Sequence, residues 1–320
     1  MEVIYGVVSI LLNGAVLIVA TQKHKGIFNS YSTLVICTTF TDLCFSIINL
    51  IVMEVPECRD SGIFFFNDNP LISGASSATA LKLTSLWLLG VYTSIMNIGF
   101  QFYHRYKVIA KGCPGSRKEV FISFGICLSI SFVLSFSEIF TLIPGRENEN
   151  YVKELEDDIM FDGKVVSFSV SDPKNPKCLF HLMLSQIFIT AVYGTVIYCS
   201  VSIMKALGSA GSKMSKNTIQ GNRTLNRAMF IQAVFPFVLI GIPYVFGLLG
   251  TFLHIKLPVV ALVGSLLMAF LPIANALTLL TTIPSYRRKF FEILGIKGSK
   301  IQSSTTQISR TKVSDTNEAL

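Results

Sequence analysis

The sequence predicts an all-α membrane protein, a seven-transmembrane helix bundle with its N-terminus outside the cell and its C-terminus in the cytoplasm. Of its 320 residues, 51% are hydrophobic and only 14% are charged, against roughly 25% charged residues in an ordinary soluble domain. The apolar residues also come in blocks of about 20, the helix length that crosses the hydrocarbon core of a bilayer. This composition argues against a soluble enzyme, a disordered protein and a disulfide-rich secreted module.

Seven apolar segments are expected to form the transmembrane helices of one membrane domain over residues 1–291. They lie at about residues 3–21, 33–55, 81–103, 119–143, 180–204, 227–253 and 258–282. Residues 292–320 are predicted to form a disordered cytoplasmic tail, because the stretch past Gly298 is rich in Ser and Thr and poor in apolar side chains. Its hydroxyl groups could accept regulatory phosphates, although an ordinary solvated tail has the same composition.

The net charge is +8, and the positions of the charged residues indicate how the chain crosses the membrane. The first, third and fifth connections between segments contain Lys and Arg but no acid, and the tail is also basic. The second and fourth connections are acidic. Because basic loops stay in the cytoplasm, this alternation places the N-terminus outside. The lipid bilayer is therefore the expected surroundings of the chain, and nucleic acid is not an expected partner.

The outer connections contain two further signals. Between residues 144 and 179, Asp162-Gly163 stands among β-forming residues and predicts a small hairpin lid over the bundle, with a mobile acidic loop as the alternative. Cys58 and Cys178 are the cysteines expected on the oxidising side of the membrane. They are predicted to form a disulfide, against the alternative of two unpaired thiols.

The sequence shows no constellation of catalytic residues. The seventh segment lacks a lysine for a retinal Schiff base, and neither a His-Glu-x-x-His motif nor a pair of intramembrane aspartates is present. Glu54, Lys82 and Glu138 lie near outer ends of segments, where their side chains can extend to the interface. We therefore predict no enzyme activity, no cofactor and no metal site, and the scarcity of intramembrane charge argues against an ion pump.

Asp42 lies deep in the second segment, where an unpartnered carboxylate costs at least ~2.5 kcal/mol. Asn13 and Asn275 lie at comparable depths in the first and seventh segments and are its expected partners. Pro236 and Pro243 each remove a backbone hydrogen bond and predict a bent sixth helix. These five residues are predicted to form a conformational switch. The alternatives are a structural knot of hydrogen bonds and ordinary membrane prolines.

The cytoplasmic end of the third segment places Arg105 among aromatic residues, next to Tyr106. A planar guanidinium at this position can exchange an internal partner for an incoming protein helix. We predict that Arg105, Tyr106 and Arg227, at the start of the sixth segment, couple the bundle to a protein partner. Anchoring at the lipid headgroups is the alternative for an arginine among aromatics.

Aromatic side chains suggest a cavity between the outer halves of the third, fifth, sixth and seventh segments, for a small apolar ligand with one or two polar groups. The predicted ligand-binding residues are Trp87, Tyr92, His181, Tyr244 and Phe246. Plain core packing or an interfacial belt is the alternative for aromatics at this depth.

Several stretches resemble the nematode serpentine chemoreceptors of the Str superfamily, most closely class delta (Srd). They are Ser30-Tyr31-Ser32, Thr41-Asp42-Leu43, Tyr103-His104-Arg105-Tyr106, Arg223-Thr-Leu-Asn-Arg-Ala-Met-Phe-Ile-Gln-Ala-Val-Phe-Pro236 and Pro284-Ser-Tyr-Arg287. The resemblance extends to about Phe291. By this resemblance Arg105 stands where receptors of the larger class carry the arginine of Asp-Arg-Tyr, with His104 in place of the acid.

The resemblance implies a chemosensory G-protein-coupled receptor in the plasma membrane, expected in the cilium of a sensory neuron. Such a receptor binds a small odorant or soluble cue and activates a heterotrimeric G protein, and a kinase or arrestin is a further expected partner at the tail. The alternative function is a ligand-gated channel or small-solute transporter. The scarcity of buried charge and the lack of internal repeats count against that alternative.

Overall fold

The computed structural model describes residues 2–22, 28–72, 74–113, 116–156, 166–209 and 258–293, a few positions between 230 and 249, and residue 295. Within these ranges, six helices are long and apolar enough to span a membrane. They are α1 (Glu2–Thr21), α2 (Phe28–Val52), α3 (Ser77–Ile109), α4 (Arg117–Thr141), α6 (Pro176–Ser209) and α9 (Pro258–Thr282). The expected segment at 227–253 lies almost entirely outside the described residues.

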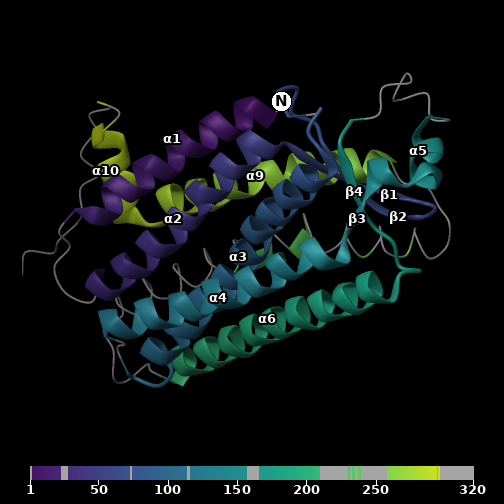
Figure 1. The fold of residues 1–320 in the computed structure, drawn as a ribbon. Helices are drawn as coiled ribbons and strands as arrows, with labels where there is room; N and C mark the ends of the chain where they lie inside the picture. Colours follow the sequence, from purple (N-terminus) through teal and green to yellow (C-terminus); the bar gives the residue numbers. More distant parts are fainter. Residues whose placement is uncertain are drawn as a thin grey trace, which may run out of the picture.

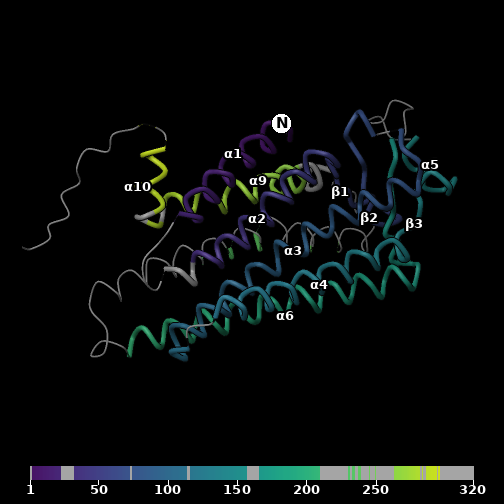
Figure 2. The backbone as a smooth tube through the Cα atoms, turned by 60° about the vertical axis from the view of Figure 1, so that its left-hand side comes forward, coloured from purple at the N-terminus to yellow at the C-terminus, as the bar shows by residue number. Residues whose placement is uncertain are grey.

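The helices form an elongated bundle (Figure 1). Helix α3 packs against α2, α4 and α6, while α1 packs against α2 and α9. A short helix, α10 (Pro284–Ile293), follows α9 (Figure 2). It crosses the end of the bundle at which α9 finishes and contacts α1 and α9 there. Helix α3 is therefore the central element, and any change in its packing reaches three neighbours.

A four-stranded antiparallel sheet covers the other end of the bundle, where only a small hairpin lid was expected from the sequence (Figure 1). We call it the cap sheet, and the end that it covers the cap end. Its strand order is β1-β2-β4-β3. The strands are β1 (Glu54–Arg59), β2 (Gly62–Asn67), β4 (Phe168–Ser171) and β3 (Ile143–Pro144). A 3-10 turn, η1 (Gly145–Glu147), and a helix, α5 (Glu149–Glu156), follow β3.

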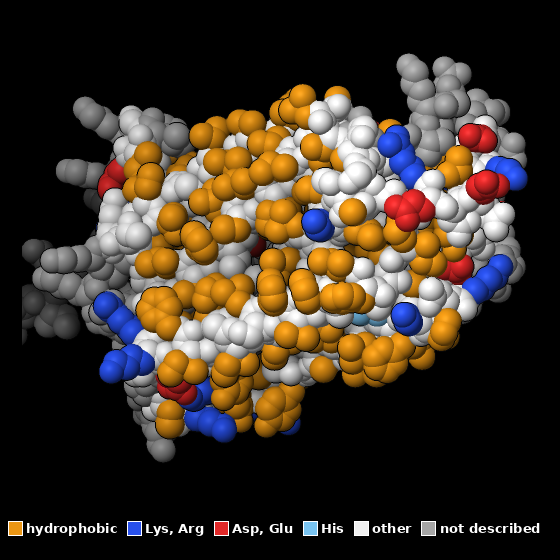
Figure 3. Space-filling model, viewed as in Figure 1, with side chains coloured by type: hydrophobic (Ala, Val, Ile, Leu, Met, Phe, Trp, Pro, Cys, Tyr) orange, Lys and Arg blue, Asp and Glu red, His pale blue; other side chains and the backbone are white. Residues whose placement is uncertain are grey.

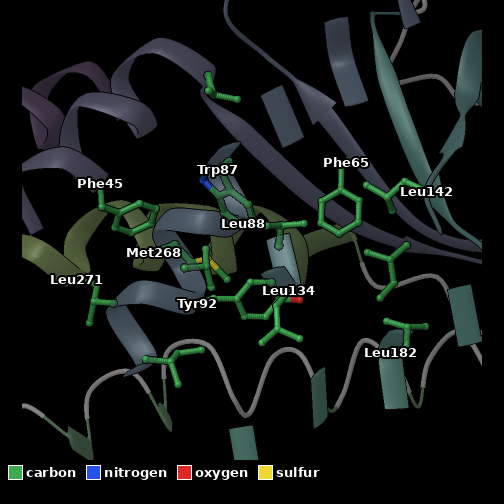
Figure 4. Packing of buried hydrophobic residues seen from close by; sticks show 14 of the residues in the cluster. Phe45, Phe65, Trp87, Leu88, Tyr92, Leu134, Leu142, Leu182, Met268 and Leu271 are labelled. Carbon is green, nitrogen blue, oxygen red and sulfur yellow. The ribbon is translucent and has the colours of Figure 1, made fainter. Parts of the chain in front are cut away.

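Strand β2 holds the cap sheet in place because both of its faces are buried. Alternate residues of a strand point to opposite faces. Ile63 and Phe65 join the core cluster of the bundle, where Figure 4 shows Phe65 close to Leu142. Phe64 and Phe66 pack instead with a group from α5 and β4, made up of Tyr151, Leu155, Phe168 and Val170. Since each buried Phe contributes about 1.5–3 kcal/mol, the cap is a packed layer of the protein.

Helix α2 ends earlier than the segment predicted at 33–55. It stops at Val52 because Met53 adopts a left-handed backbone conformation, with φ of 48°. This turns the chain into β1, and the Met53 carbonyl accepts a hydrogen bond from the Asp68 amide at 3.0 Å. The predicted turn at Asp162-Gly163 lies outside the described residues, and β4, which follows it, pairs with β2 and β3.

The surface of the bundle is apolar along its length. Hydrophobic side chains cover the middle of the face shown in Figure 3, and charged side chains lie mainly towards its two ends. Large exposed side chains such as Leu11, Ile122 and Ile187 point outwards from α1, α4 and α6. Such a surface is stable against lipid hydrocarbon and would be unstable in water.

Candidate functional site

Asp42 and Asn275 join α2 to α9 inside the bundle. The Asp42 side chain is buried, and the Asn275 Nδ2 atom donates to both of its carboxylate oxygens, at 3.2 and 3.4 Å. This is the contact expected between these two residues. It gives the carboxylate a partner where an uncompensated charge in hydrocarbon would be costly.

Asn13 does not contact the Asp42 carboxylate, contrary to expectation, but it joins the same region by another route. Its Nδ2 atom lies 3.2 Å from the carbonyl oxygen of Pro272 in α9 and 3.2 Å from the Ser9 hydroxyl. The Ser9 hydroxyl contacts that of Ser46 at 2.6 Å, and Ser46 donates to the Asp42 backbone carbonyl at 2.7 Å. Buried hydrogen bonds therefore connect α1, α2 and α9 on both sides of Asp42.

A small polar cavity lies beside the Asp42–Asn275 contact. Its volume is about 10 Å³, which is room for about one water molecule. It is lined by Thr38, Asp42, Ser94, Asn97, Ile98, Gln101, Phe102 and Asn275. Within the described part of the chain, Ser94 Oγ and Asn97 Oδ1 have no hydrogen-bond partner, while Asn97 Nδ2 donates to the Thr41 hydroxyl of α2. We call this the switch cavity.

A second buried polar cluster, which sequence reasoning missed, surrounds Glu138 near the cap end. Glu138 was expected to extend to the interface, but it is buried between α3, α4 and α6. Its Oε1 atom accepts from the Tyr92 hydroxyl at 3.1 Å and lies 3.1 Å from His181 Nδ1. Its Oε2 atom accepts from the Thr141 hydroxyl at 3.3 Å. One carboxyl group therefore ties three helices together.

The predicted ligand-binding residues form packed contacts in the structure. Tyr92 and His181 are held by Glu138, and the His181 Nε2 atom also contacts the Leu134 carbonyl at 3.2 Å. Trp87 is 1% exposed and donates to the Asn49 side chain at 2.8 Å. Figure 4 shows Trp87 and Tyr92 within the core cluster. Neither the switch cavity nor the groove described below is lined by these three residues. Tyr244 and Phe246 lie outside the described residues.

Glu54 anchors the cap sheet to α3. It too was expected at the interface, but it is 2% exposed. Asn67 Nδ2 donates to its Oε2 atom, and the Thr84 hydroxyl donates to Oε1 at 2.6 Å. Burial raises the pKa of Glu54 to about 8, although these two hydrogen bonds oppose the shift. Asn67 Oδ1 has no hydrogen-bond partner among the described residues.

The stability of the protein is expected to fall as pH rises from 5 to 8.5 because of Glu54. Its folded pKa lies above the ordinary value of 4.5, so its contribution is complete below about 4.5 and is lost as pH rises through about 8. The slope is at most about 1.4 kcal/mol per pH unit. Thermal unfolding of the purified protein across this range checks the expectation. Glu54→Gln should flatten the curve, and parallel curves for wild type and variant would contradict it.

The end of α3 opposite the cap carries the residues predicted to couple to a protein partner. Arg105 is buried there. The Tyr106 ring lies 5.7 Å from that of Tyr198 on α6, and Lys107 forms an ion pair with Glu119 of α4. Arg227 and the two prolines assigned to the switch, Pro236 and Pro243, lie outside the described residues.

The disulfide predicted between Cys58 and Cys178 is not formed in the part of the chain that the structure describes. The Cys178 thiol instead donates to the Thr141 carbonyl oxygen at 2.5 Å. Cys58 lies on β1, opposite Ile63, and packs against the core cluster. The pairing of strands β1, β2 and β4 links the connections that the disulfide was expected to join.

The arrangement of the helices matches that of a known class of membrane proteins. The crystal structure of squid rhodopsin superposes with a TM-score of 0.67 and 14% sequence identity, covering 91% of this chain and 78% of the rhodopsin chain. This likeness shows the fold alone, that of a seven-transmembrane receptor. The predicted seven-helix membrane bundle is thereby confirmed.

A comparison of the sequence with models of protein families identifies the family. Residues 1–291 match the family model described as serpentine type 7TM GPCR chemoreceptor Str, and the chain belongs to this family. A comparison with curated proteins finds no match. The resemblance to the Str superfamily is confirmed, and the protein is a membrane receptor of the G-protein-coupled type and not an enzyme. The assignment to class delta stays a prediction.

Proposed function

We propose that this receptor detects a small environmental cue, an odorant or a soluble chemical, and activates a heterotrimeric G protein. The observation that carries the proposal is the chain of buried hydrogen bonds through Asn13, Asp42 and Asn275, which meets the switch cavity. Interior polar contacts between helices can be exchanged for others when the helices shift. A cue that binds one arrangement better than the other shifts their populations by no more than its differential affinity.

The proposed orientation places the cap sheet outside the cell. It rests on the basic connections, which lie at the end away from the cap, and on the acidic residues of the connections that form the cap. We propose that the receptor lies in the plasma membrane of a chemosensory cell, in its cilium, and that a kinase or arrestin acts on the Ser/Thr-rich tail.

Arg105→Ala is expected to leave surface expression intact and to weaken signalling on the order of tenfold, as for removal of a typical coupling contact. Arg105 is buried at the proposed cytoplasmic end of α3, where its guanidinium can exchange partners as the helix ends separate. Arg146→Ala, at the cap end, is the matched control and should signal normally. If well-expressed Arg105→Ala signalled at the level of the wild type, Arg105 would have no role in coupling.

The proposed function is tested in a heterologous cell with verified surface expression. A mixed panel of volatile and water-soluble cues is applied while second-messenger signal and membrane current are recorded, with and without G-protein blockade. We expect a response that the blockade abolishes. A current that survives the blockade would overturn the proposal in favour of a ligand-gated channel.

A further inference from the structure

A groove opens on the membrane-facing surface between α2, α3 and α4. Its volume is about 500 Å³. Phe40, Phe132 and Val133 form its rim and are each more than half exposed. Inside, the Phe45 ring packs so closely on α3 that a Cβ atom at Gly90 would lie 2.2 Å from it. No charged residue is among those that line the groove.

The inner wall of the groove has a polar group that lacks a partner. Thr93 lines the groove and is only 6% exposed, and in the described part of the chain its hydroxyl makes no hydrogen bond. The other hydroxyls of the wall are engaged, since Thr41 donates to the Thr38 carbonyl at 2.8 Å and Ser129 donates to that of Gly125 at 2.9 Å. Thr93 therefore provides a hydrogen-bonding point for an occupant of the groove.

The depth of Thr93 defines the chemistry of that occupant. Thr93 lies midway along α3 (Ser77–Ile109), about half the hydrocarbon thickness of roughly 30 Å from either membrane surface. A phospholipid keeps its headgroup at the surface and can offer only an acyl chain at this depth. An uncharged molecule with one hydroxyl or carbonyl group can partition into the hydrocarbon and satisfy Thr93.

We propose that this groove is a binding site for an uncharged, mainly apolar small molecule with one hydrogen-bonding group, such as a long-chain alcohol, which enters from the bilayer. The site is connected to the switch cavity, because the Thr41 hydroxyl on its wall accepts from Asn97, which lines that cavity together with Asp42. An occupant that contacts Thr41 is thus one hydrogen bond from the switch cavity. Binding here does not depend on the proposed signalling function.

Photolabelling of the full-length receptor in phosphatidylcholine nanodiscs tests the site. The probe is a long-chain alcohol that carries a diazirine on its alkyl chain, and mass spectrometry maps the labelled peptides. We expect saturable labelling at Phe40, Phe132 or Val133 that excess unlabelled dodecanol removes. Thr93→Val keeps the shape and removes the hydroxyl, so it should raise the half-saturating concentration about fivefold, the worth of one hydrogen bond.

A second pair of variants tests the shape of the groove. Ser129 lines it from α4, so Ser129→Trp should fill it and abolish saturable labelling, whereas Ile130→Trp, an exposed position that does not line it, should leave labelling unchanged. The unfolding temperature of each variant verifies its fold. Labelling that rises linearly with probe, resists dodecanol or is equal in both Trp variants would show contact with the lipid-facing surface only and would overturn the proposal.

Discussion

Replacing Glu138 with leucine is expected to lower the unfolding temperature of the purified receptor by roughly 6–10 °C. The change removes the acceptor of Tyr92 and Thr141 and the partner of His181. Hydrogen bonds between membrane helices contribute about 0.6–1.7 kcal/mol each, and burying the abandoned His181 and Tyr92 groups adds a desolvation cost of about 1–3 kcal/mol. Each kcal/mol corresponds to about 2–4 °C in a chain of this size class.

Thermal unfolding in nanodiscs measures this loss directly. Glu138→Gln keeps an acceptor for Tyr92 and should recover part of the stability. Phe136→Leu, at an exposed position of the same helix, is the matched control and should change the unfolding temperature little. If Glu138→Leu unfolded at the temperature of the wild type, the cluster would be incidental to the packing of α3, α4 and α6.

The second large effect is expected from Asn275→Asp. It places a second carboxyl group within about 3 Å of Asp42, where two carboxylates cannot both ionise. Disruption of a buried polar pair of this kind costs about 3 kcal/mol or more, which lowers the unfolding temperature by roughly 6–12 °C. Adding Asp42→Asn restores an acid and an amide with their positions exchanged, and should recover most of the loss.

Comparing the single variants with the double variant separates the stability that comes from the contact between residues 42 and 275 from the stability that each residue contributes alone. Asp42→Asn alone keeps an amide contact and should cost less than about 1 kcal/mol. A doubly substituted receptor no more stable than Asn275→Asp would mean that the contact between α2 and α9 does not depend on this pair.

The Asp42–Asn275 contact could be predicted from the sequence because a carboxylate deep in a membrane segment needs a polar partner at a similar depth. The same reasoning misplaced Glu54 and Glu138. Both lie near segment ends, where a side chain usually reaches the headgroups, but here the cap sheet and neighbouring helices cover them. Their partners Asn67, Thr84 and His181 come from other elements, and those contacts exist only after the chain has folded.

The cap sheet itself could be predicted only in part. The run Ile63-Phe64-Phe65-Phe66 between two membrane segments is typical of a strand buried on both faces. Its partner β4 lies about a hundred residues later in the chain, and pairing over such a distance leaves no local pattern. The assignment of aromatic residues to a ligand site stays a prediction, because a residue type at a given depth cannot distinguish a cavity wall from a packed core.

The connectivity of the cap sheet also orders the biogenesis of the receptor. Strands β1 and β2 are synthesised before α3, whereas β3 and β4 follow α4, so the first hairpin lacks its partner strands while α3 and α4 are synthesised. During that interval its edge and its phenylalanines are unpaired, which is the state that promotes aggregation and chaperone binding. A nascent chain that stops before residue 168 cannot complete the sheet. The cap sheet can therefore form only after α4 has been synthesised.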